Sequence, residues 1–232
     1  MYSFSVIIPV LNESPIINHT IEHVYQRGSG FDPEVIVVDG DSRGDTLAAI
    51  KNKDVIKIIS PKGRGKQMNR GASVAQGDIL LFLHTDTELP KDAFEAISSA
   101  MNKLQLVGGA FDLGIKSDRS VFRLVEELVY MRTRLTKVPY GDQAIFMKKE
   151  IFDKVSGFKE IPVMEDVEFM RRVKRSGYKI CIIPQMVKTS PRRWEKEGVL
   201  YCTVRNWALI TLYSLGVNPE KLVRFYYRDW EQ

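Results

Sequence analysis

Three short apolar runs in the first half of the chain each end in polar and acidic residues. The runs cover residues 4–11, 35–38 and 79–83, and they are followed by Asn12-Glu13, Asp39-Gly40-Asp41-Ser42 and His84-Thr85-Asp86-Thr87. Runs rich in β-branched residues are typical of strands buried on both faces of a parallel sheet. Polar residues just past the carboxyl ends of such strands lie where open α/β sheets bind ligands. The sequence therefore predicts a parallel sheet with an acidic binding edge.

Helical patterns alternate with these runs through residues 1–105. They predict helices over residues 15–28, 45–51, 66–75 and 90–104, and a further strand over residues 55–60. Ser14-Pro15 offers an N-cap followed by proline at the first helical position. This alternation implies parallel βαβ units with right-handed crossovers.

The second half of the chain is less regular. Its patterns predict strands over residues 107–113, 143–147 and 179–183, and helices over residues 121–135, 165–176, 199–215 and from Pro219 onward. No repeat, low-complexity tract or linker divides the chain. We predict a single α/β domain over residues 1–232, with a mostly parallel central sheet flanked by helices and a C-terminal helical extension.

The charge balance limits the classes of partner. The 232 residues hold 34 Lys and Arg against 29 Asp and Glu, which gives a net charge of +5. This excess suits phosphorylated ligands or an anionic membrane surface, but it is too small to indicate nucleic acid. The longest apolar stretch, residues 207–217, is too short to span a bilayer. We therefore expect at most peripheral membrane contact, through the C-terminal helices.

The cysteines bear on the compartment. Cys181 and Cys202 are isolated and lack the spacing of a metal site, which favours reduced thiols. No signal-peptide pattern precedes the first predicted strand. We expect a cytoplasmic protein, at most peripheral on the inner face of the membrane.

The carboxylates after the second apolar run suit a nucleoside. Asp39 and Asp41 would accept hydrogen bonds from a nucleobase imide and from ribose hydroxyls at the end of a strand. The alternative is turn chemistry, because Asp tolerates the tight loop that Asp-Gly-Asp-Ser predicts. Asn12 and Glu13 would lie beside Asp39 in a parallel sheet, and this favours the binding interpretation.

The segment after the third run is a candidate metal site. Asp86 follows a buried strand, and a carboxylate there can hold a divalent cation that bridges diphosphate oxygens. Asp86 and Glu88 could instead begin the helix opened by Pro90. His84 is either a supporting ligand or a histidine packed in the core.

Two familiar phosphate motifs are absent. Gly63-Arg64-Gly65-Lys66 lacks the earlier glycine of a P-loop, and Gln67 stands where that motif has Ser or Thr. No GxGxxG follows the first strand, which argues against a dinucleotide-binding oxidoreductase. Arg64 and Lys66 then either approach a pyrophosphate or form a solvated basic loop.

Two clusters in the second half could carry chemistry. Glu165-Asp166 begins a predicted helix, where a carboxylate either takes the proton of an attacking hydroxyl or complements the helix dipole. Arg192-Arg193-Trp194 lies in a predicted loop. It could clamp a pyrophosphate, with the tryptophan against a sugar, or form a basic surface turn.

Five motifs, taken in order, carry a family resemblance. They are Val6 to Glu13, Val37 to Ser42, Gly65-Lys66 to Gly77-Asp78, Leu83 to Thr87, and Glu165-Asp166. Together they resemble the family 2 glycosyltransferases of the GT-A fold, over about residues 4–210. The His-Thr-Asp-Thr form and the Arg-Arg-Trp segment look like the small soluble bacterial branch of that family.

The resemblance implies roles for individual residues. It assigns nucleotide binding to Pro9, Asn12, Glu13, Asp39, Asp41, Lys66 and Arg193. It assigns a Mg²⁺ or Mn²⁺ ion to Asp86 and His84, and catalysis to Asp166 as the base with Glu165 in support. Acceptor binding falls to Gly109, Asp142, Gln143 and Trp194. The chain then divides into a Rossmann-like nucleotide-sugar half (1–105), an acceptor and catalytic half (106–196) and a helical tail (197–232).

Two departures from the family pattern affect these roles. His84 replaces the first Asp of the metal-binding DxD motif, and Ser190 stands where processive synthases have the Gln of Gln-x-x-Arg-Trp. With no transmembrane helix predicted, coupled polysaccharide synthesis and export is not expected.

The resemblance implies an inverting glycosyltransferase that moves a sugar from a nucleotide-diphosphate sugar, expected to be UDP-linked, to an acceptor hydroxyl with the help of a metal. A sugar-phosphate nucleotidyltransferase is the alternative enzyme, but it would carry a Gly-rich basic loop where this chain has Asn12-Glu13. A protein that binds nucleotide sugars without turnover is a third interpretation. The acceptor (a glycan, a lipid or a small molecule) and homodimer formation stay open.

Overall fold

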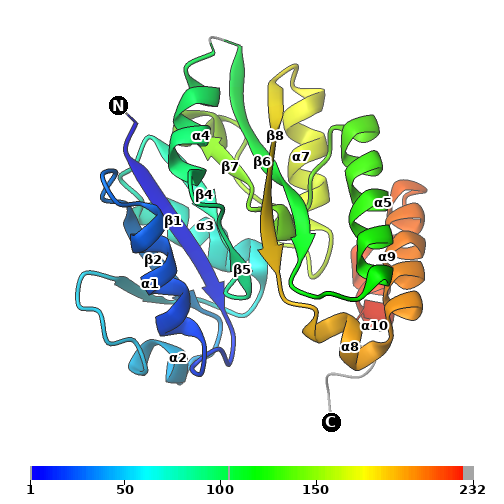
Figure 1. The fold of residues 1–232 in the computed structure, drawn as a ribbon, viewed down its shortest axis with the longest axis horizontal. Helices are drawn as coiled ribbons and strands as arrows, with labels where there is room; N and C mark the ends of the chain where they lie inside the picture. Colours follow the sequence, from blue (N-terminus) through cyan, green and yellow to red (C-terminus); the bar gives the residue numbers. More distant parts are fainter. Residues whose placement is uncertain (1, 104, 227–232) are drawn as a thin grey trace.

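A computed structural model describes residues 2–103 and 105–226, in which eight strands form one sheet (Figure 1). The strands are β1 (Phe4–Val10), β2 (Glu34–Asp39), β3 (Ile56–Ile59), β4 (Ile79–Phe82), β5 (Thr87–Glu88), β6 (Leu106–Ile115), β7 (Phe146–Lys148) and β8 (Lys179–Thr189). Their order across the sheet is β3-β2-β1-β4-β7-β6-β8-β5.

The helices follow the predicted alternation in the first half, and most of those in the second half gather at one end. They are α1 (Ile17–Arg27), α2 (Asp45–Ala48), α3 (Arg64–Val74), α4 (Ala93–Met101), α5 (Ser120–Thr136), α6 (Lys149–Lys154), α7 (Glu165–Arg175), α8 (Arg192–Glu197), α9 (Val199–Ser214) and α10 (Pro219–Tyr226), with a 3₁₀ turn η1 (Gly141–Gln143). Among the described residues, no helix has the length and apolar character needed to cross a bilayer.

The sheet is mostly parallel, as predicted. β1 pairs in parallel with β2 and β4, β2 pairs in parallel with β3, and β6 pairs in parallel with β8. β7 lies antiparallel between β4 and β6, and the short β5 lies antiparallel to β8. The carboxyl ends of β1, β2 and β4 therefore meet at one edge.

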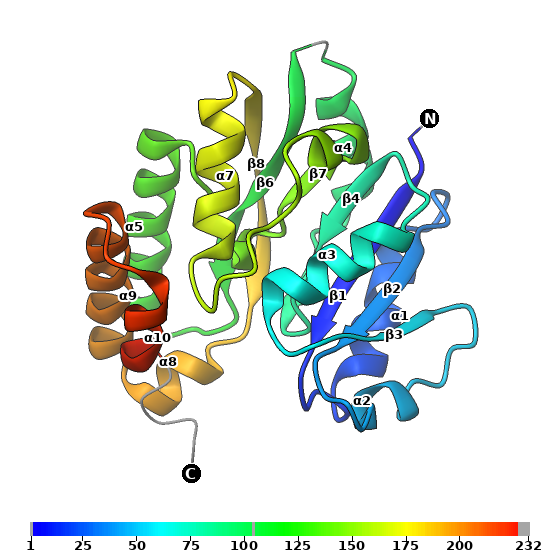
Figure 2. The ribbon, with the colours of Figure 1, turned by 180° about the vertical axis from the view of Figure 1, so that it is seen from behind.

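Helices cover both faces of the sheet, which explains the continuous apolar runs. Val6 and Ile8 of β1 pack in the core beneath α1 and α4 (Figure 1), whereas Ile7 packs in the core beneath α3 and α7 (Figure 2). Because successive side chains of a strand point to opposite faces, a strand covered on both sides needs apolar residues at every position.

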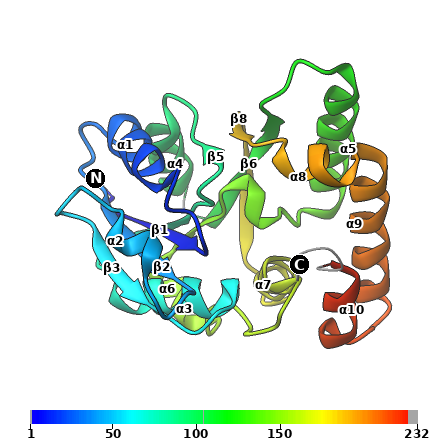
Figure 3. The same ribbon diagram turned by 90° about the horizontal axis from the view of Figure 1, so that it is seen from below.

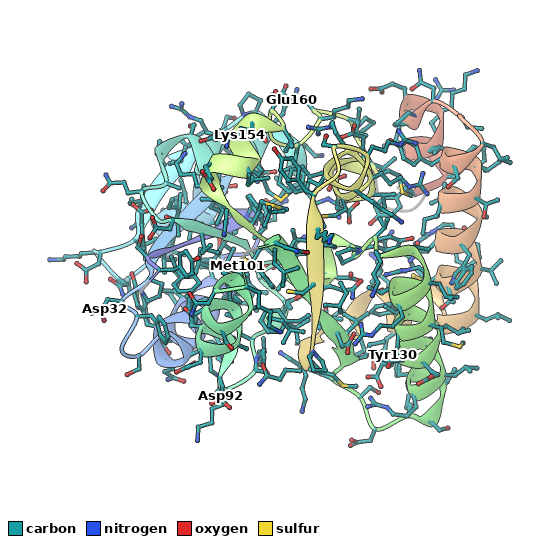
Figure 4. The ribbon with its side chains drawn as sticks, turned by 90° about the horizontal axis from the view of Figure 1, so that it is seen from above. Asp32, Asp92, Met101, Tyr130, Lys154 and Glu160 are labelled. Atoms are coloured by element: carbon teal, nitrogen blue, oxygen red, sulfur yellow. The ribbon has the colours of Figure 1, made fainter. Side chains whose placement is uncertain are left out.

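A second group of helices lies beside the far part of the sheet. α5 and α9 run next to each other there, with α8 and α10 packed against α9 (Figure 3). Figure 4 shows Tyr130 on α5, with α9 on the outer side of that helix. This arrangement confirms the predicted helical extension.

Several predicted boundaries were wrong. Ser14-Pro15 lies in a turn before α1, whose N-cap is Ile16 without a side-chain capping bond. Residues 192–194, expected in a loop, begin α8. The strand expected over residues 143–147 begins only at Phe146, because Gln143 belongs to η1.

The last long strand and two short elements also differ from prediction. β8 continues to Thr189, six residues beyond the expected end, and places Ser190 beside the loop of Asp86: the Ser190 N–H donates to the Asp86 carbonyl at 3.0 Å. The sequence patterns did not predict α6, and Glu88 lies in β5 rather than at a helix start.

Candidate functional site

The carboxylate that ends β2 is completely buried. Asp39 pairs with Val10 of β1 in the parallel register, and its exposed fraction is 0%. Its Oδ1 accepts a hydrogen bond from the Asp41 N–H at 2.9 Å. Its Oδ2 has no hydrogen-bond partner among the described residues. A buried acceptor without a partner is costly, so this oxygen is suited to an N–H or O–H brought by a ligand.

Other residues predicted to bind a nucleotide surround Asp39 at the same edge. Glu13 is half-buried, and burial raises the pKa of its carboxyl, partly opposed by Arg192. Asn12 adopts a left-handed backbone conformation at φ 58° and is exposed. Pro9 lies in β1, opposite Val38 of β2. The turn after β1 thus stands beside the end of β2, as the parallel register requires.

Asp41 and Lys66 are placed less directly. The Asp41 carboxylate forms an ion pair with Arg43 at 2.9 Å and is held to that side chain by hydrogen bonds. Lys66 lies half-buried in the first turn of α3. Both residues are at the predicted edge. The charge of Asp41 is already paired with Arg43, whereas Lys66 forms no ion pair with an acid among the described residues.

Gln67 is a site residue that sequence reasoning missed. It is buried, and its Nε2 donates to the carbonyls of Val10 and Val38, each at 2.8 Å. These bonds tie α3 to the ends of β1 and β2. The sequence marked Gln67 only as a departure from a P-loop, and nothing in its local pattern indicates contacts with strands 29 and 57 positions away.

A cavity of about 210 Å³ lies between the sheet edge and helices α5, α7, α8 and α9. Its lining includes one histidine and six charged side chains: His84, Arg64, Asp86, Arg132, Asp142, Asp166 and Arg193. Trp194 of α8 also lines it and packs edge-on against Phe122, with ring centroids 6.1 Å apart. Asp86, from the first half of the chain, and Asp166, from the second half, thus line the same cavity.

Asp166 is fixed with its carboxylate on the cavity wall. Its Oδ2 accepts from the Gly141 N–H and its Oδ1 from the Val167 N–H, both at 2.7 Å. The adjacent Glu165 points elsewhere: it is buried, and its Oε1 lies 2.6 Å from Nε of Arg64. Burial raises the pKa of Glu165, and Arg64 opposes that rise. Of the two neighbouring acids, only Asp166 is available to a ligand.

Asp142 is a half-buried acid of the same cavity, and its Oδ1 atom is buried. Its Oδ1 has no hydrogen-bond partner among the described residues. Burial raises the pKa of Asp142 to about 6, and Arg132 opposes the rise whereas Asp166 and Asp86 add to it. The charged form of this carboxyl is therefore unfavourable unless a cation lies beside it.

The raised pKa predicts a pH-dependent contribution to stability. Between about pH 4 and 6 the folded protein holds a proton on Asp142 that the unfolded chain has lost, so stability falls as pH rises through this window. An asparagine at this position does not titrate, so Asp142→Asn should not lose stability in this window. Without added metal, the variant should be more stable than the wild type above pH 6, by at most about 3 kcal/mol.

Urea unfolding at pH 4 and pH 7 measures this difference. Asp92→Asn, at an exposed position, is the matched control and should leave the pH dependence unchanged. If the difference in free energy of unfolding between Asp142→Asn and the wild type is the same at pH 4 and pH 7, Asp142 does not titrate in this window.

Two residues predicted to bind the acceptor make structural contacts. The Gln143 side chain is fully engaged, since its Oε1 accepts from Arg132 and the Tyr140 N–H and its Nε2 donates to the Phe111 carbonyl. Gly109 lies within β6, where an added Cβ would stand 2.3 Å from the carbonyl oxygen of Cys181. Turn bonding and sheet packing account for Gln143 and Gly109, and their contact with an acceptor stays a prediction.

The family comparison agrees with this arrangement. Residues 5–159 match Glycosyl transferase family 2. The chain belongs to this family. It is 25% identical over 218 residues to the probable glycosyltransferase YdaM of Bacillus subtilis, covering 83% of this chain and 50% of that protein. It is 26% identical over 188 residues to the dolichol-phosphate mannosyltransferase of Pyrococcus furiosus, covering 77% and 51%. The chain thus spans about half the length of these relatives.

Solved structures of glycosyltransferases share the fold. The mannosyltransferase PcManGT from Pyrobaculum calidifontis, in complex with GDP-Man and Mn²⁺, superposes with a TM-score of 0.62 at 20% identity, covering 81% of this chain and 56% of that one. TarS of S. aureus, in complex with UDP-GlcNAc, gives 0.61 at 18%, covering 81% and 58%. This family 2 chain therefore has the GT-A fold.

The two arginines of α8 face different neighbours in this family 2 chain. Arg193, predicted to bind the nucleotide, lines the cavity but is also held by Glu197 at 3.3 Å and by the Tyr226 ring, 4.0 Å away. Arg192 instead extends to Asp86 at 3.7 Å and to Glu13 at 3.9 Å. Arg192 therefore lies beside two acids of the predicted site, and the sequence did not distinguish it from its neighbour.

The residues of the predicted metal site fit a hard cation bound together with a ligand. Asp86 keeps 32% of its side chain exposed, and the unpartnered Asp142 oxygen adds negative charge to the same cavity. His84 lines the cavity too, and burial, followed by Arg64, lowers its pKa, which keeps the imidazole neutral at pH 7. Within residues 2–103 and 105–226, no three His, Cys, Asp or Glu side chains are grouped closely enough to hold an ion alone.

Proposed function

We propose that this chain transfers a sugar from a nucleotide-diphosphate sugar to an acceptor hydroxyl, with inversion at the anomeric carbon. The observation that carries the proposal is the meeting of Asp86, from the loop after β4, and Asp166, from the first turn of α7, in one cavity. Family membership and the GT-A fold support it. The named ligands of the two solved neighbours, GDP-Man and UDP-GlcNAc, support a nucleotide sugar as donor.

The nucleotide is proposed to bind at the acidic edge. Asp39 would accept the imide N–H of a uracil base through its unpartnered Oδ2. Asn12, Glu13 and Asp41 would contact the nucleoside around it, and Lys66 would approach the diphosphate from the first turn of α3. A uracil imide suits a lone acceptor at a strand end, so UDP is the proposed nucleotide.

The diphosphate is proposed to bind near Asp86 with Mg²⁺ or Mn²⁺. Asp86 would hold the ion with His84 in support, because hard divalent cations prefer oxygen ligands. When bound, the ion supplies charge stabilisation to the leaving diphosphate. Arg192 lies close enough to Asp86 to add a second positive charge on the same side, with Arg193 farther along α8.

Asp166 is proposed as the general base. Its two N–H bonds orient the carboxylate, which takes the proton of the acceptor hydroxyl as that oxygen bonds to the anomeric carbon. The bond from that carbon to the diphosphate oxygen breaks, and its electron pair leaves with the diphosphate. Glu165 supports the base by fixing Arg64 beside it. Positioning and charge stabilisation suffice, so no covalent enzyme intermediate is needed.

Release of nucleoside diphosphate from a panel of UDP- and GDP-sugars, with and without Mn²⁺, tests the proposal. We expect release from at least one UDP-sugar, dependent on a divalent ion. Binding of these donors without any release would leave a nucleotide-sugar-binding protein instead.

Asp39→Asn should weaken UDP binding by about 1–3 kcal/mol, or roughly 5- to 150-fold. The variant keeps an oxygen for the Asp41 N–H but puts an amide donor where the imide N–H is proposed to bind. Calorimetric titration with UDP and Mn²⁺ measures the change. Asp41→Asn, whose side chain is already paired with Arg43, should cost less. Equal affinities for Asp39→Asn and the wild type would remove Asp39 from the site.

The C-terminal helices support peripheral contact with a membrane as part of this proposal. Large apolar side chains are exposed on two of the helices beside the sheet. They are Leu200 and Val204 of α9, Leu215 just beyond the end of α9, and Leu124 and Leu135 of α5. Exposed apolar residues beside basic ones favour association with an anionic lipid surface.

A further inference from the structure

A second, larger hollow lies outside the proposed catalytic cavity. This groove, of about 770 Å³, runs between α7 and α9 beside the C-terminal end of α5. Its lining includes Arg132, Arg171, Lys174 and Arg175, together with Tyr140 and Trp207. None of its described lining residues is acidic. Several cations lining one hollow without acids create a positive potential that favours an anion.

Three of the groove cations, Arg171, Lys174 and Arg175, form no ion pair with an acid among the described residues. Arg171 donates to Oγ of Ser214 at 2.7 Å, and Lys174 donates to the Thr136 carbonyl at 2.9 Å. Arg175 is exposed, with no ion pair in the described part of the chain. The acid of the same helix, Glu168, faces Arg172 and Lys159 instead.

Arg132 connects this groove to the catalytic cavity. Its guanidinium lies over the Tyr140 ring, 3.4 Å from the centroid, and donates to Gln143 at 2.9 Å. Its Nε is buried without a hydrogen-bond partner in the described part of the chain. Arg132, Tyr140 and Trp207 line both hollows. A ligand in the groove can therefore extend toward Asp166.

The remaining lining gives the groove a mixed character. Val138 and Ile210 add aliphatic surface, and Trp207 adds an exposed aromatic face. A ligand that fits has an apolar body and an anionic end. Because a phosphate group offers several oxygens to several N–H donors at once, a phosphomonoester matches this set of cations best.

We propose that the groove binds a phosphate group carried by the acceptor, at a distance from the hydroxyl that receives the sugar. The inference rests on the proposed function, because it uses the adjoining cavity as the place of transfer. It narrows the acceptor to an apolar molecule with a phosphate end. Arg171, Lys174 and Arg175 bind the phosphate, and Trp207 contacts the body of the molecule.

Calorimetric binding of octyl phosphate, compared with octyl glucoside, tests the groove, both below micelle-forming concentrations. Octyl phosphate should bind the wild type at least about tenfold more tightly. The double variant Lys174→Gln/Arg175→Gln should lose about tenfold or more of that affinity, whereas Arg70→Gln, an exposed arginine on α3, should lose none. Equal binding of the two alkyl compounds, or equal loss in the control, would overturn the proposal.

Two further experiments show whether the phosphate belongs to a lipid or to a free molecule, and they test this inference separately from the proposed function. Sedimentation with phosphatidic acid vesicles, abolished by the double variant, would indicate a lipid phosphate, whereas binding of octyl phosphate alone would indicate a free one. Displacement of octyl phosphate by UDP or GDP with Mn²⁺ would place it in the donor site and overturn the inference. If neither nucleotide binds at all while octyl phosphate does, the proposed function fails, and with it the assignment of the ligand as an acceptor.

Discussion

Asp166→Asn is expected to lower sugar transfer by about 10²- to 10⁴-fold while leaving UDP binding in place. The amide cannot take the acceptor proton, but it keeps the shape of the side chain on the cavity wall. One of the two N–H bonds, from Gly141 or Val167, is lost, which costs about 1 kcal/mol of stability. Transfer rate, UDP affinity and melting temperature, measured on the same preparation, separate these effects.

Glu165→Gln is the matched control for that variant. It changes the neighbouring acid, but it weakens a buried ion pair with Arg64 rather than a group facing the cavity. We expect a larger loss of melting temperature than in Asp166→Asn and a smaller loss of transfer per folded molecule. Full activity in Asp166→Asn would rule out Asp166 as the base.

Asp86→Ala is expected to abolish the dependence of UDP binding on Mn²⁺ and most of the transfer activity. Asp86 is partly exposed, and its ion pair with Arg192 is long, at 3.7 Å, so its removal should leave the fold intact. Titration of UDP with and without Mn²⁺ measures the loss. The effect follows from the preference of hard cations for carboxylate oxygen over imidazole nitrogen.

Two further variants serve as comparisons for Asp86→Ala. His84→Ala should be milder, because a neutral imidazole is the weaker ligand. Glu88→Ala removes an acid two residues further on that is already paired with Lys116, and it should leave the response to Mn²⁺ unchanged. A greater loss in His84→Ala than in Asp86→Ala would reverse the assignment of the ligands.

The acidic edge could be predicted from the sequence because its cause is local. A strand covered on both faces must be apolar at every position, so β1, β2 and β4 are legible as runs, and their carboxyl ends necessarily meet. Asp39 and Asp86 could be named for that reason. Gln67 could not, since its two carbonyl partners lie far away in the sequence.

Two of the three Ser-Pro dipeptides, Ser14-Pro15 and Ser190-Pro191, show why helix starts were less predictable. Ser14-Pro15 has the expected pattern but makes no capping bond, and α1 begins after it. Ser190 accepts a hydrogen bond from the Arg192 N–H at 3.2 Å and does precede a helix, α8. The dipeptide is the same in both places, so the surrounding tertiary contacts decide the outcome, as they decide the structural roles of Gly109 and Gln143.

The position of β7 has a consequence for how the molecule holds together. β7 pairs with β4 on one side and with β6 on the other, so a strand from the second half closes the edge of the first. A piece ending near residue 105 would leave β4 as an open edge, with unpaired N–H and carbonyl groups that invite association with other chains. The two halves predicted from the sequence therefore share one sheet, and we expect neither of them to be stable as a separate module.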